Sequence, residues 1–271
     1  MFTTNNLLYD NRERCVRPRG IMYHALEAQK IRNTIRTMVD EGALLDYSVG
    51  VSGSTALSWK IHEDPGKHSQ PRVYFRPCDC DIFVCRKHCL DEKGTSVFNS
   101  FVHACLHRLL EGGYKAYDLH MWKHQYIHVN EDTMMAEFWV EGIRTKFSLI
   151  ECSREETVFD VVKLFDFDLV QAVYDFRNKK VLMDAKAEQN LSNGLMKVSQ
   201  CLADTLDQME EGLAEGDLMV DNSMQWKLSS TIGRIRKYEL RGFTVAHAEE
   251  WRDRMEKILD EVVDAYIMKC D

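Results

Sequence analysis

The 271-residue sequence has few prolines, no long apolar run and no excess of positive charge. Four prolines and 14 glycines leave little room for long flexible linkers. No apolar run approaches the roughly 20 residues of a membrane-spanning helix, and the start lacks the basic-then-apolar order of a secretory signal. With 35 Lys and Arg against 43 Asp and Glu, a net charge of −8 disfavours a general nucleic-acid coat protein. We therefore expect a soluble cytoplasmic protein without a membrane partner.

Nine cysteines are present, an odd number in a chain with no sign of secretion. Disulfides belong mainly to small secreted domains, so we expect reduced thiols that are mostly buried. Four of these cysteines lie close to His88, and they are Cys78, Cys80, Cys85 and Cys89. Their spacing matches no common zinc knuckle or ribbon, and the pattern therefore disfavours structural zinc.

Hydrophobic periodicity separates a mixed N-terminal part from a helical C-terminal part. Before residue 186 it predicts helices over 21–42, 55–62, 94–110 and 155–165, a polar loop over 62–71, and strands over 45–52, 72–85, 126–129, 134–140, 145–152 and 169–174. After that point it predicts helices over 191–209, 224–241 and 245–268. The sequence thus predicts an α+β fold: a mixed sheet flanked by helices in a domain over 1–185, followed by a helical domain over 186–271 that closes a cleft.

Two aspartates, Asp79 and Asp81, lie within a strongly apolar run. Residues two apart on a strand point the same way and lie roughly 7 Å apart, so we expect these carboxylates to share a face. Unpaired carboxylates this close repel each other, and a shared cation relieves the repulsion. Mg²⁺ prefers oxygen ligands and completes its shell with water and phosphate oxygens, so the pair predicts a magnesium site.

A second feature, Gly53-Ser54, follows a predicted strand and begins a predicted helix. Glycine lets a backbone come close to a phosphate, and the free N–H groups at a helix start favour anions. Together with the aspartates, Gly53 and Ser54 predict a phosphate cradle opposite a metal site, which is the minimum for metal-assisted phosphoryl or nucleotidyl transfer.

The order of strand, Gly53-Ser54, helix, strand and Asp79-x-Asp81 resembles the signature of the DNA polymerase β-like nucleotidyltransferase superfamily. The resemblance covers about residues 45–175 and implies a nucleotidyltransferase-like sheet. The gap between Ser54 and Asp79 is longer than usual, and the polar loop accounts for it as an insertion. Segments 165–168 and 234–243 are similar to elements of nucleotidyltransferase-like proteins of phages and large DNA viruses.

The resemblance also implies a third carboxylate on a neighbouring strand, which completes the metal site and helps to activate an acceptor hydroxyl. Glu151, between Ile150 and Cys152, fits this description best. Glu141 fits second, and Asp166 and Asp168 fit less well. If none of them faces the aspartate pair, the same fold binds a nucleotide without transferring it.

A basic stretch follows near residue 234, and its candidate nucleotide-binding residues are Arg234, Lys237 and Arg241. We interpret it as a positive wall of the cleft that contacts a triphosphate or a nucleic-acid acceptor. The alternative is a solvated helix face.

The residues and the resemblance together predict a metal-dependent nucleotidyltransferase. It would move an NMP from an NTP such as ATP to a hydroxyl acceptor on RNA, protein or a small molecule, with Mg²⁺ or Mn²⁺ as cofactor. Asp79, Asp81 and Glu151 are its expected catalytic residues. The alternative is a catalytically silent protein of the same fold that binds nucleic acid or protein. The base, the acceptor and the oligomeric state stay open at this point.

Overall fold

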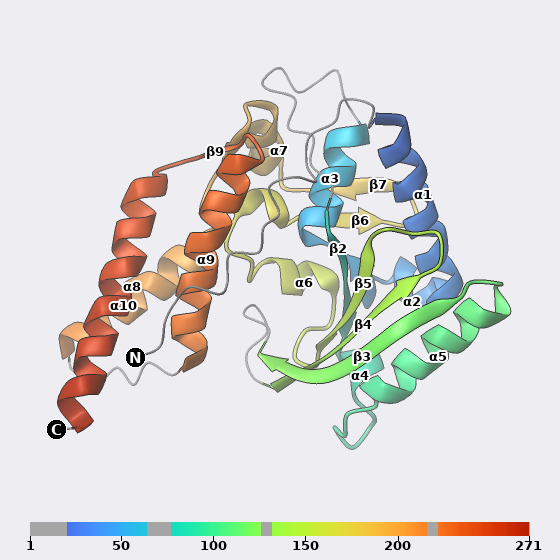
Figure 1. Ribbon diagram of the computed structural model, residues 1–271, viewed down its shortest axis with the longest axis horizontal. Coiled ribbons are helices and arrows are strands. Elements are labelled where there is room, and N and C mark those ends of the chain that lie inside the picture. The colour runs from blue at the N-terminus through green and yellow to red at the C-terminus, as the bar shows by residue number, and fades with distance from the viewer. Residues whose placement is uncertain (1–20, 64–76, 126–131, 216–221, 271) are drawn as a thin grey trace.

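A computed structural model describes residues 21–63, 77–125, 132–215 and 222–270. Its main sheet has five strands in the order β1-β2-β5-β4-β3 (Figure 1). These strands are β1 (Val49–Val51), β2 (Asp79–Cys85), β3 (Ala116–Gln125), β4 (Asp132–Val140) and β5 (Lys146–Cys152). β2 and β5 are parallel, and the other neighbours are antiparallel. The expected mixed α+β fold is thus confirmed.

One face of the sheet is apolar and covered by helices. It carries alternate residues of the central strands, such as Cys80, Ile82 and Leu149, all fully buried. Helices α1 (Ile21–Met38), α2 (Glu41–Leu45) and α5 (Phe98–Glu111) pack against it. The period of two in β2 explains the pattern, because it sends apolar side chains to this face and the aspartates to the other.

The close approach of α5 to α1 depends on the glycine that ends α5. A Cβ added at Gly112 would overlap Thr37 Cγ2 on α1 and lie 3.3 Å from the Arg108 carbonyl oxygen. We expect Gly112→Ala to lower the free energy of unfolding by about 1–3 kcal/mol, as overpacking does. Gly233→Ala is the control, since nothing lies within 4 Å of its Cβ in a helix, and it should raise stability by roughly 0.5–1 kcal/mol. Urea denaturation measures both changes, and equal effects would contradict the close contact.

The remaining helices and short strands surround the sheet, and several of them also contribute residues to the buried cluster on its apolar face. They are α3 (Gly53–Glu63), α4 (Arg86–Cys89), α6 (Val158–Val162), a 3-10 helix (Asp168–Val170), β6 (Val173–Asp175), β7 (Lys180–Leu182), α7 (Ala185–Ser192), β8 (Leu195–Met196), α8 (Gln200–Glu215), α9 (Asn222–Leu240), β9 (Thr244–Val245) and α10 (Ala248–Cys270). Figure 1 shows α8, α9 and α10 side by side, away from the sheet.

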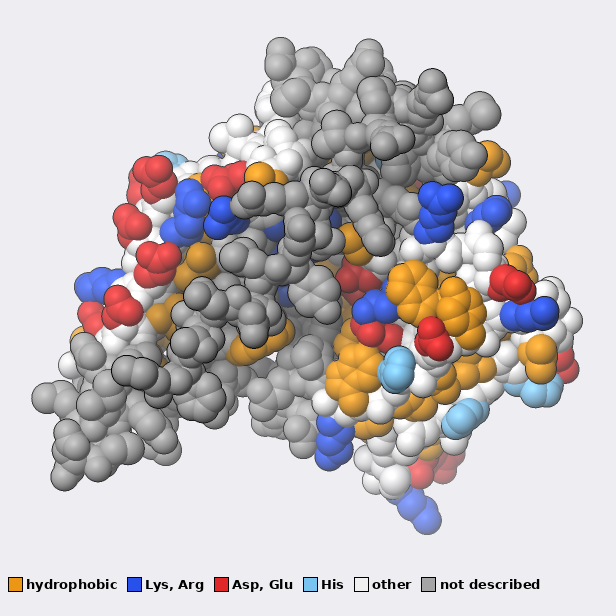
Figure 2. All heavy atoms as spheres, viewed as in Figure 1, with side chains coloured by type: hydrophobic (Ala, Val, Ile, Leu, Met, Phe, Trp, Pro, Cys, Tyr) orange, Lys and Arg blue, Asp and Glu red, His pale blue; other side chains and the backbone are white. Residues whose placement is uncertain are grey.

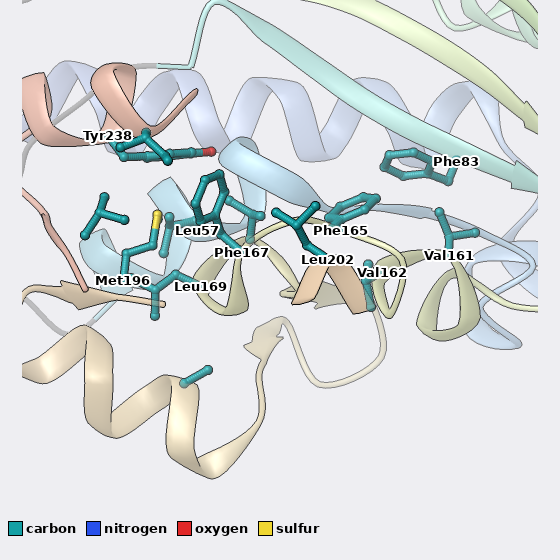
Figure 3. Packing of buried hydrophobic residues seen from close by; sticks show 14 of the residues in the cluster. Leu57, Phe83, Val161, Val162, Phe165, Phe167, Leu169, Met196, Leu202 and Tyr238 are labelled. Carbon is teal, nitrogen blue, oxygen red and sulfur yellow. The ribbon is translucent and has the colours of Figure 1, made fainter. Parts of the chain in front are cut away.

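A single apolar cluster joins the sheet to the C-terminal helices. Phe83 of β2 and Leu57 of α3 belong to the same buried cluster as Leu202 of α8 and Tyr238 of α9. Figure 3 shows Phe165 and Phe167 in the middle of this cluster, with Tyr238 beside Phe167. The helices after residue 185 are therefore fixed against the sheet through a shared core.

Some predicted elements differ from the observed ones. The strand predicted over 72–85 begins at Asp79, and the stretch predicted over 169–174 is a 3-10 helix followed by β6. The strand predicted over 126–129 lies outside the described residues, as does most of the predicted loop over 62–71. β3 was not predicted from the sequence, because its exposed face mixes polar and aromatic side chains and the apolar alternation is lost. In the part of the chain that is described, no helix is long and apolar enough to cross a membrane.

Candidate functional site

The two aspartates of β2 lie side by side on the polar half of a sheet face. Asp79 pairs in register with Lys146 of β5, and Asp81 pairs with Ser148. Two residues further along β2, the same face turns apolar at Phe83, which is fully buried. The polar half therefore remains as a distinct patch beside the shared core, and both aspartates are only partly buried.

Electrostatics make Asp81 the most perturbed carboxylate of this patch. Burial, followed by the neighbouring charge of Asp79, raises the pKa of Asp81 to about 8. The cations Lys237, Arg234 and Lys146 act in the opposite direction but do not compensate. No hydrogen bond or ion pair to either aspartate carboxylate is found among the described residues. A divalent cation would relieve this repulsion, so the donor set fits Mg²⁺, with phosphate oxygens and water as the other ligands.

The Gly53-Ser54 turn lies next to the pair. Gly53 has φ +67°, a backbone conformation that favours glycine, and it begins α3. Thr55, in the first turn of α3, donates a hydrogen bond of 2.7 Å from Oγ1 to the carbonyl oxygen of Asp79. Ser52, the residue before Gly53, donates a hydrogen bond of 2.6 Å from Oγ to the carbonyl oxygen of Ala172. The start of α3 is thereby held beside the first aspartate, where its free N–H groups suit an anion.

The basic residues of α9 face the carboxylates from the helical side. Burial lowers the pKa of Lys237 and Arg241 lowers it further, whereas the charges of Asp79 and Asp81 raise it. Arg241 also stacks on Tyr238, with its guanidinium carbon 5.2 Å from the ring centre. Lys237 is surrounded by these groups yet remains open to solvent, which is the environment of a cation on a cleft wall.

Asp166 connects this wall to the rest of the fold. Its buried carboxylate accepts hydrogen bonds from Arg234 Nη1 at 2.7 Å and from Thr231 Oγ1 at 3.0 Å. Asp168 accepts hydrogen bonds from the backbone N–H groups of Leu169 and Lys197 and from the side-chain amide of Asn190. Both carboxylates are thus engaged by these donors, and neither is among the charges that act on Asp81.

Glu151 does not lie with the aspartates, so the prediction that it completes the site is wrong in geometry. It pairs in register with Val84, which places it on the helix-covered face. There its carboxylate accepts hydrogen bonds from Ser96 Oγ at 3.0 Å and from the Met134 backbone at 2.9 Å. Glu141 is exposed in the turn after β4 and pairs with Lys115 at 3.7 Å. An apolar flank indicates a strand but not which of its faces a carboxylate occupies.

The sequence analysis missed Glu137 of β4, which faces the site. Glu137 pairs in register with Ser148, which pairs in turn with Asp81. Its carboxylate forms an ion pair of 2.5 Å with Lys146 and accepts a hydrogen bond of 3.3 Å from Ser148 Oγ. Its place beside the aspartates depends on the order and register of β2, β5 and β4, which the sequence does not show.

The cysteines form no metal centre in the described ranges. Seven of them are free thiols, and Cys80, Cys85, Cys89 and Cys152 are buried. No group of three or more His, Cys, Asp or Glu side chains is arranged to hold a metal ion in those ranges. Most of the described cysteines are buried, as the sequence predicts, whereas Cys78 is exposed.

A comparison of the chain with protein-family models and with curated proteins found no match. The geometry of the chain itself must therefore carry the functional argument.

Proposed function

We propose that the protein is a metal-dependent nucleotidyltransferase that moves an NMP from an NTP to a hydroxyl acceptor. The observation that carries the proposal is the repelling Asp79/Asp81 pair, which faces Lys237 and Arg234 across a polar patch. Negative charge on one side and positive charge on the other fit a metal-bound triphosphate. The start of α3 at Gly53 adds backbone donors for phosphate.

The proposed roles follow from these positions. Asp79 and Asp81 hold Mg²⁺ or Mn²⁺, which when bound neutralises the triphosphate and polarises its α-phosphoryl group. Lys237 and Arg234 bind phosphate oxygens, and Asp166 keeps Arg234 in place. The acceptor hydroxyl oxygen bonds to the α-phosphorus as the bond to the leaving pyrophosphate breaks. Orientation and charge stabilisation by these residues supply most of the acceleration.

Glu137 takes the role first expected of Glu151 in this proposal. It faces the same side as Asp81, two strands away, which is roughly 10 Å between backbones. A glutamate side chain covers part of that span, so Glu137 is placed to accept the proton of the acceptor hydroxyl once Lys146 turns to a phosphate.

Glu137→Gln and Glu151→Gln separate the two assignments. We expect Glu137→Gln to lower transfer roughly 10²–10⁴-fold, the usual contribution of a general base, with little change in stability. Glu151→Gln should leave transfer per folded molecule unchanged, because its carboxylate binds Ser96 and the Met134 backbone on the other face. Initial rates, normalised to folded protein by circular dichroism, provide the measurement. The opposite ranking would restore Glu151 to the site.

The direct test uses each α-³²P-labelled NTP with Mg²⁺ or Mn²⁺ and a mixture of cellular RNA and protein. Label transfer by the natural protein, lost in the Asp79→Asn/Asp81→Asn double variant, is the expected result. Equal transfer by both proteins would overturn the proposal. NTP binding is measured in parallel by equilibrium dialysis, so a missing acceptor is recognised as binding without transfer.

One observation favours the silent alternative. The position directly beside Asp81 on the neighbouring strand is Ser148, not a carboxylate. A protein of this kind would bind nucleotide with metal and fail to transfer it to every acceptor, and the dialysis arm identifies that outcome.

A further inference from the structure

The face that carries the carboxylates continues across β4 to the edge strand β3. Glu137 of β4 pairs with His120 of β3, and Trp139 pairs with Tyr117. Trp122 pairs with Met135, two residues before Glu137 on the same face. These partners alternate along β4 on the side of the aspartates, and an irregularity in β3 between Tyr117 and His120 keeps the pairing in step. Tyr117, His120, Trp122 and Trp139 therefore lie on the same side as the aspartates. We call these four residues the aromatic ledge.

The aromatic ledge is open to solvent. Tyr117 is 49% exposed, His120 is exposed, and Trp122 and Trp139 are partly buried. Helices α1 and α5 pack against the opposite face of the sheet. Figure 2 shows hydrophobic side chains gathered on this side, interspersed with charged and histidine side chains. Three aromatic rings on hydrogen-bonded strands form a rigid surface that loses little entropy on binding.

The aromatic ledge lies on β4 and β3, two and three strands away from the aspartates of β2. Adjacent strands are about 4.8 Å apart, so β4 and β3 lie roughly 10 and 14 Å from the strand of Asp81. Lys146 lies between, on β5, and the cations of α9 face the carboxylates. A chain running from the ledge to Asp81 would therefore pass the aromatic rings first and then the Glu137–Lys146 ion pair, and would meet the cations of α9 at the carboxylates.

We propose that the aromatic ledge stacks the bases next to the 3′ end of a single-stranded nucleic-acid acceptor, whose terminal hydroxyl reaches Asp79 and Asp81. Single strands bind to surfaces that combine aromatic platforms with a positive track for the backbone, which is this combination. The inference rests on the proposed function and names its acceptor class. Because the net charge is −8, binding relies on stacking and on few phosphate contacts, so its salt dependence is shallow.

The test is fluorescence anisotropy with 5′-labelled 12-nucleotide RNA and DNA of mixed sequence, without NTP or metal. Both single strands should bind, and the matching duplexes should bind at least tenfold more weakly. Tyr117→Leu and Trp139→Leu should each weaken binding roughly tenfold, the cost of one lost stack. Tyr117→Phe and Trp139→Phe keep a ring and should bind within about threefold of the natural protein.

A second arm leaves the protein unchanged, so folding does not enter. Removing the bases of the second and third nucleotides from the 3′ end should weaken binding as the leucine variants do. Leu26→Ala, an exposed apolar change on α1 (57% exposed), should have no effect. The proposal that the ledge stacks bases would be overturned by any of three results: equal affinity for abasic and complete strands, tight binding of duplexes, or no binding of single strands.

The outcome is separable from that of the proposed function. Oligonucleotide binding is measured without NTP or metal, whereas transfer requires both, so the two readouts are independent. Single-strand binding in a protein that transfers nothing would overturn the transferase and leave the ledge standing. Transfer to a small molecule by a protein that binds no oligonucleotide would support the transferase and overturn the role of the ledge.

Discussion

Asp81→Asn is expected to lower nucleotidyl transfer by roughly a thousandfold or more, the upper range for losing one essential electrostatic group, while it makes the metal-free protein more stable. The two effects have one cause. Burial and the charge of Asp79 oppose ionisation of Asp81 and raise its pKa to about 8. An amide of the same shape removes the repulsion and also removes a ligand for the metal.

The pH dependence of this gain follows from linkage. The unfolded pKa of Asp81 is near 3.9, and the folded pKa is about 8, so the folded protein holds its proton more tightly. Stability from this group is therefore fully present below about pH 4 and is lost as the pH rises to about 8. The stability advantage of Asp81→Asn in metal-free buffer should accordingly be small at pH 4, grow with pH and level off above pH 8.

Asp46 provides a control, because its pKa is shifted in the opposite direction from that of Asp81. Burial alone would raise the pKa of Asp46, but hydrogen bonds from Lys87 and Ser48 lower it to about 2. A carboxylate with a lowered pKa stabilises the fold above its unfolded pKa and loses that contribution as the pH falls. Asp46→Asn should therefore lower the melting temperature near neutral pH, and this loss should shrink below pH 4.

Thermal unfolding between about pH 2 and pH 9, with EDTA or with excess Mg²⁺, measures these effects. Mg²⁺ should raise the melting temperature of the natural protein near pH 8 and leave that of Asp81→Asn unchanged, because a ligand stabilises only the state that binds it. A melting temperature of Asp81→Asn below that of the natural protein at every pH would contradict the repulsion. Full transfer activity in the variant would contradict its role in the site.

The central part of this site was accessible from the sequence because it depends on local geometry. Alternation within β2 places Asp79 and Asp81 on one face, and φ +67° at Gly53 follows from a strand that turns directly into a helix. The basic residues of α9 were also recognised, from their density of charge. Each of these features is determined within a few residues of the chain.

The position of Glu137 on the aspartate face was not accessible from the sequence, because it depends on strand pairing. Glu137 and Glu151 both lie on strands with apolar neighbours, and they differ in which face the register gives them. A shift of one residue between β4 and β5 would move Glu137 to the face of Glu151, and local sequence does not contain that register. The aromatic ledge was missed for the same reason, since β3 becomes recognisable only beside β4.

Asp166 illustrates a related limit. Its neighbours suggested a carboxylate near the site, but the charge is used by Arg234 and Thr231, which follow 68 and 65 residues later. These contacts come from the packing of α9 against segment 165–167, where Tyr238 contacts Phe167. Arg234 is tied to Asp166, whereas Lys237 is exposed.

Lys237→Met is the second change with a large expected effect. We expect it to weaken binding of ATP with Mg²⁺ roughly 10–100-fold, because a charge-assisted hydrogen bond to a phosphate contributes about 1.5–3 kcal/mol. Lys237 lies close enough to Asp79 and Asp81 for their charges to raise its pKa. Removing its charge should also raise the pKa of Asp81 further, since Lys237 is the first of the cations that lower it.

Arg236→Met is the matched control, because Arg236 is exposed one residue earlier on α9 and is not among the cations that act on Asp81. Isothermal titration calorimetry of both variants should give a large loss for Lys237→Met and a change below about twofold for Arg236→Met, as expected of a screened surface charge. The pH dependence of unfolding without metal adds an independent readout. Loss of Lys237 should raise the pKa of Asp81, so stability should continue to fall above pH 8. Equal losses in both variants would show that α9 acts through its overall charge, and the wall would then be a solvated helix face. A selective loss together with the shifted profile would place Lys237 between the carboxylates and the triphosphate.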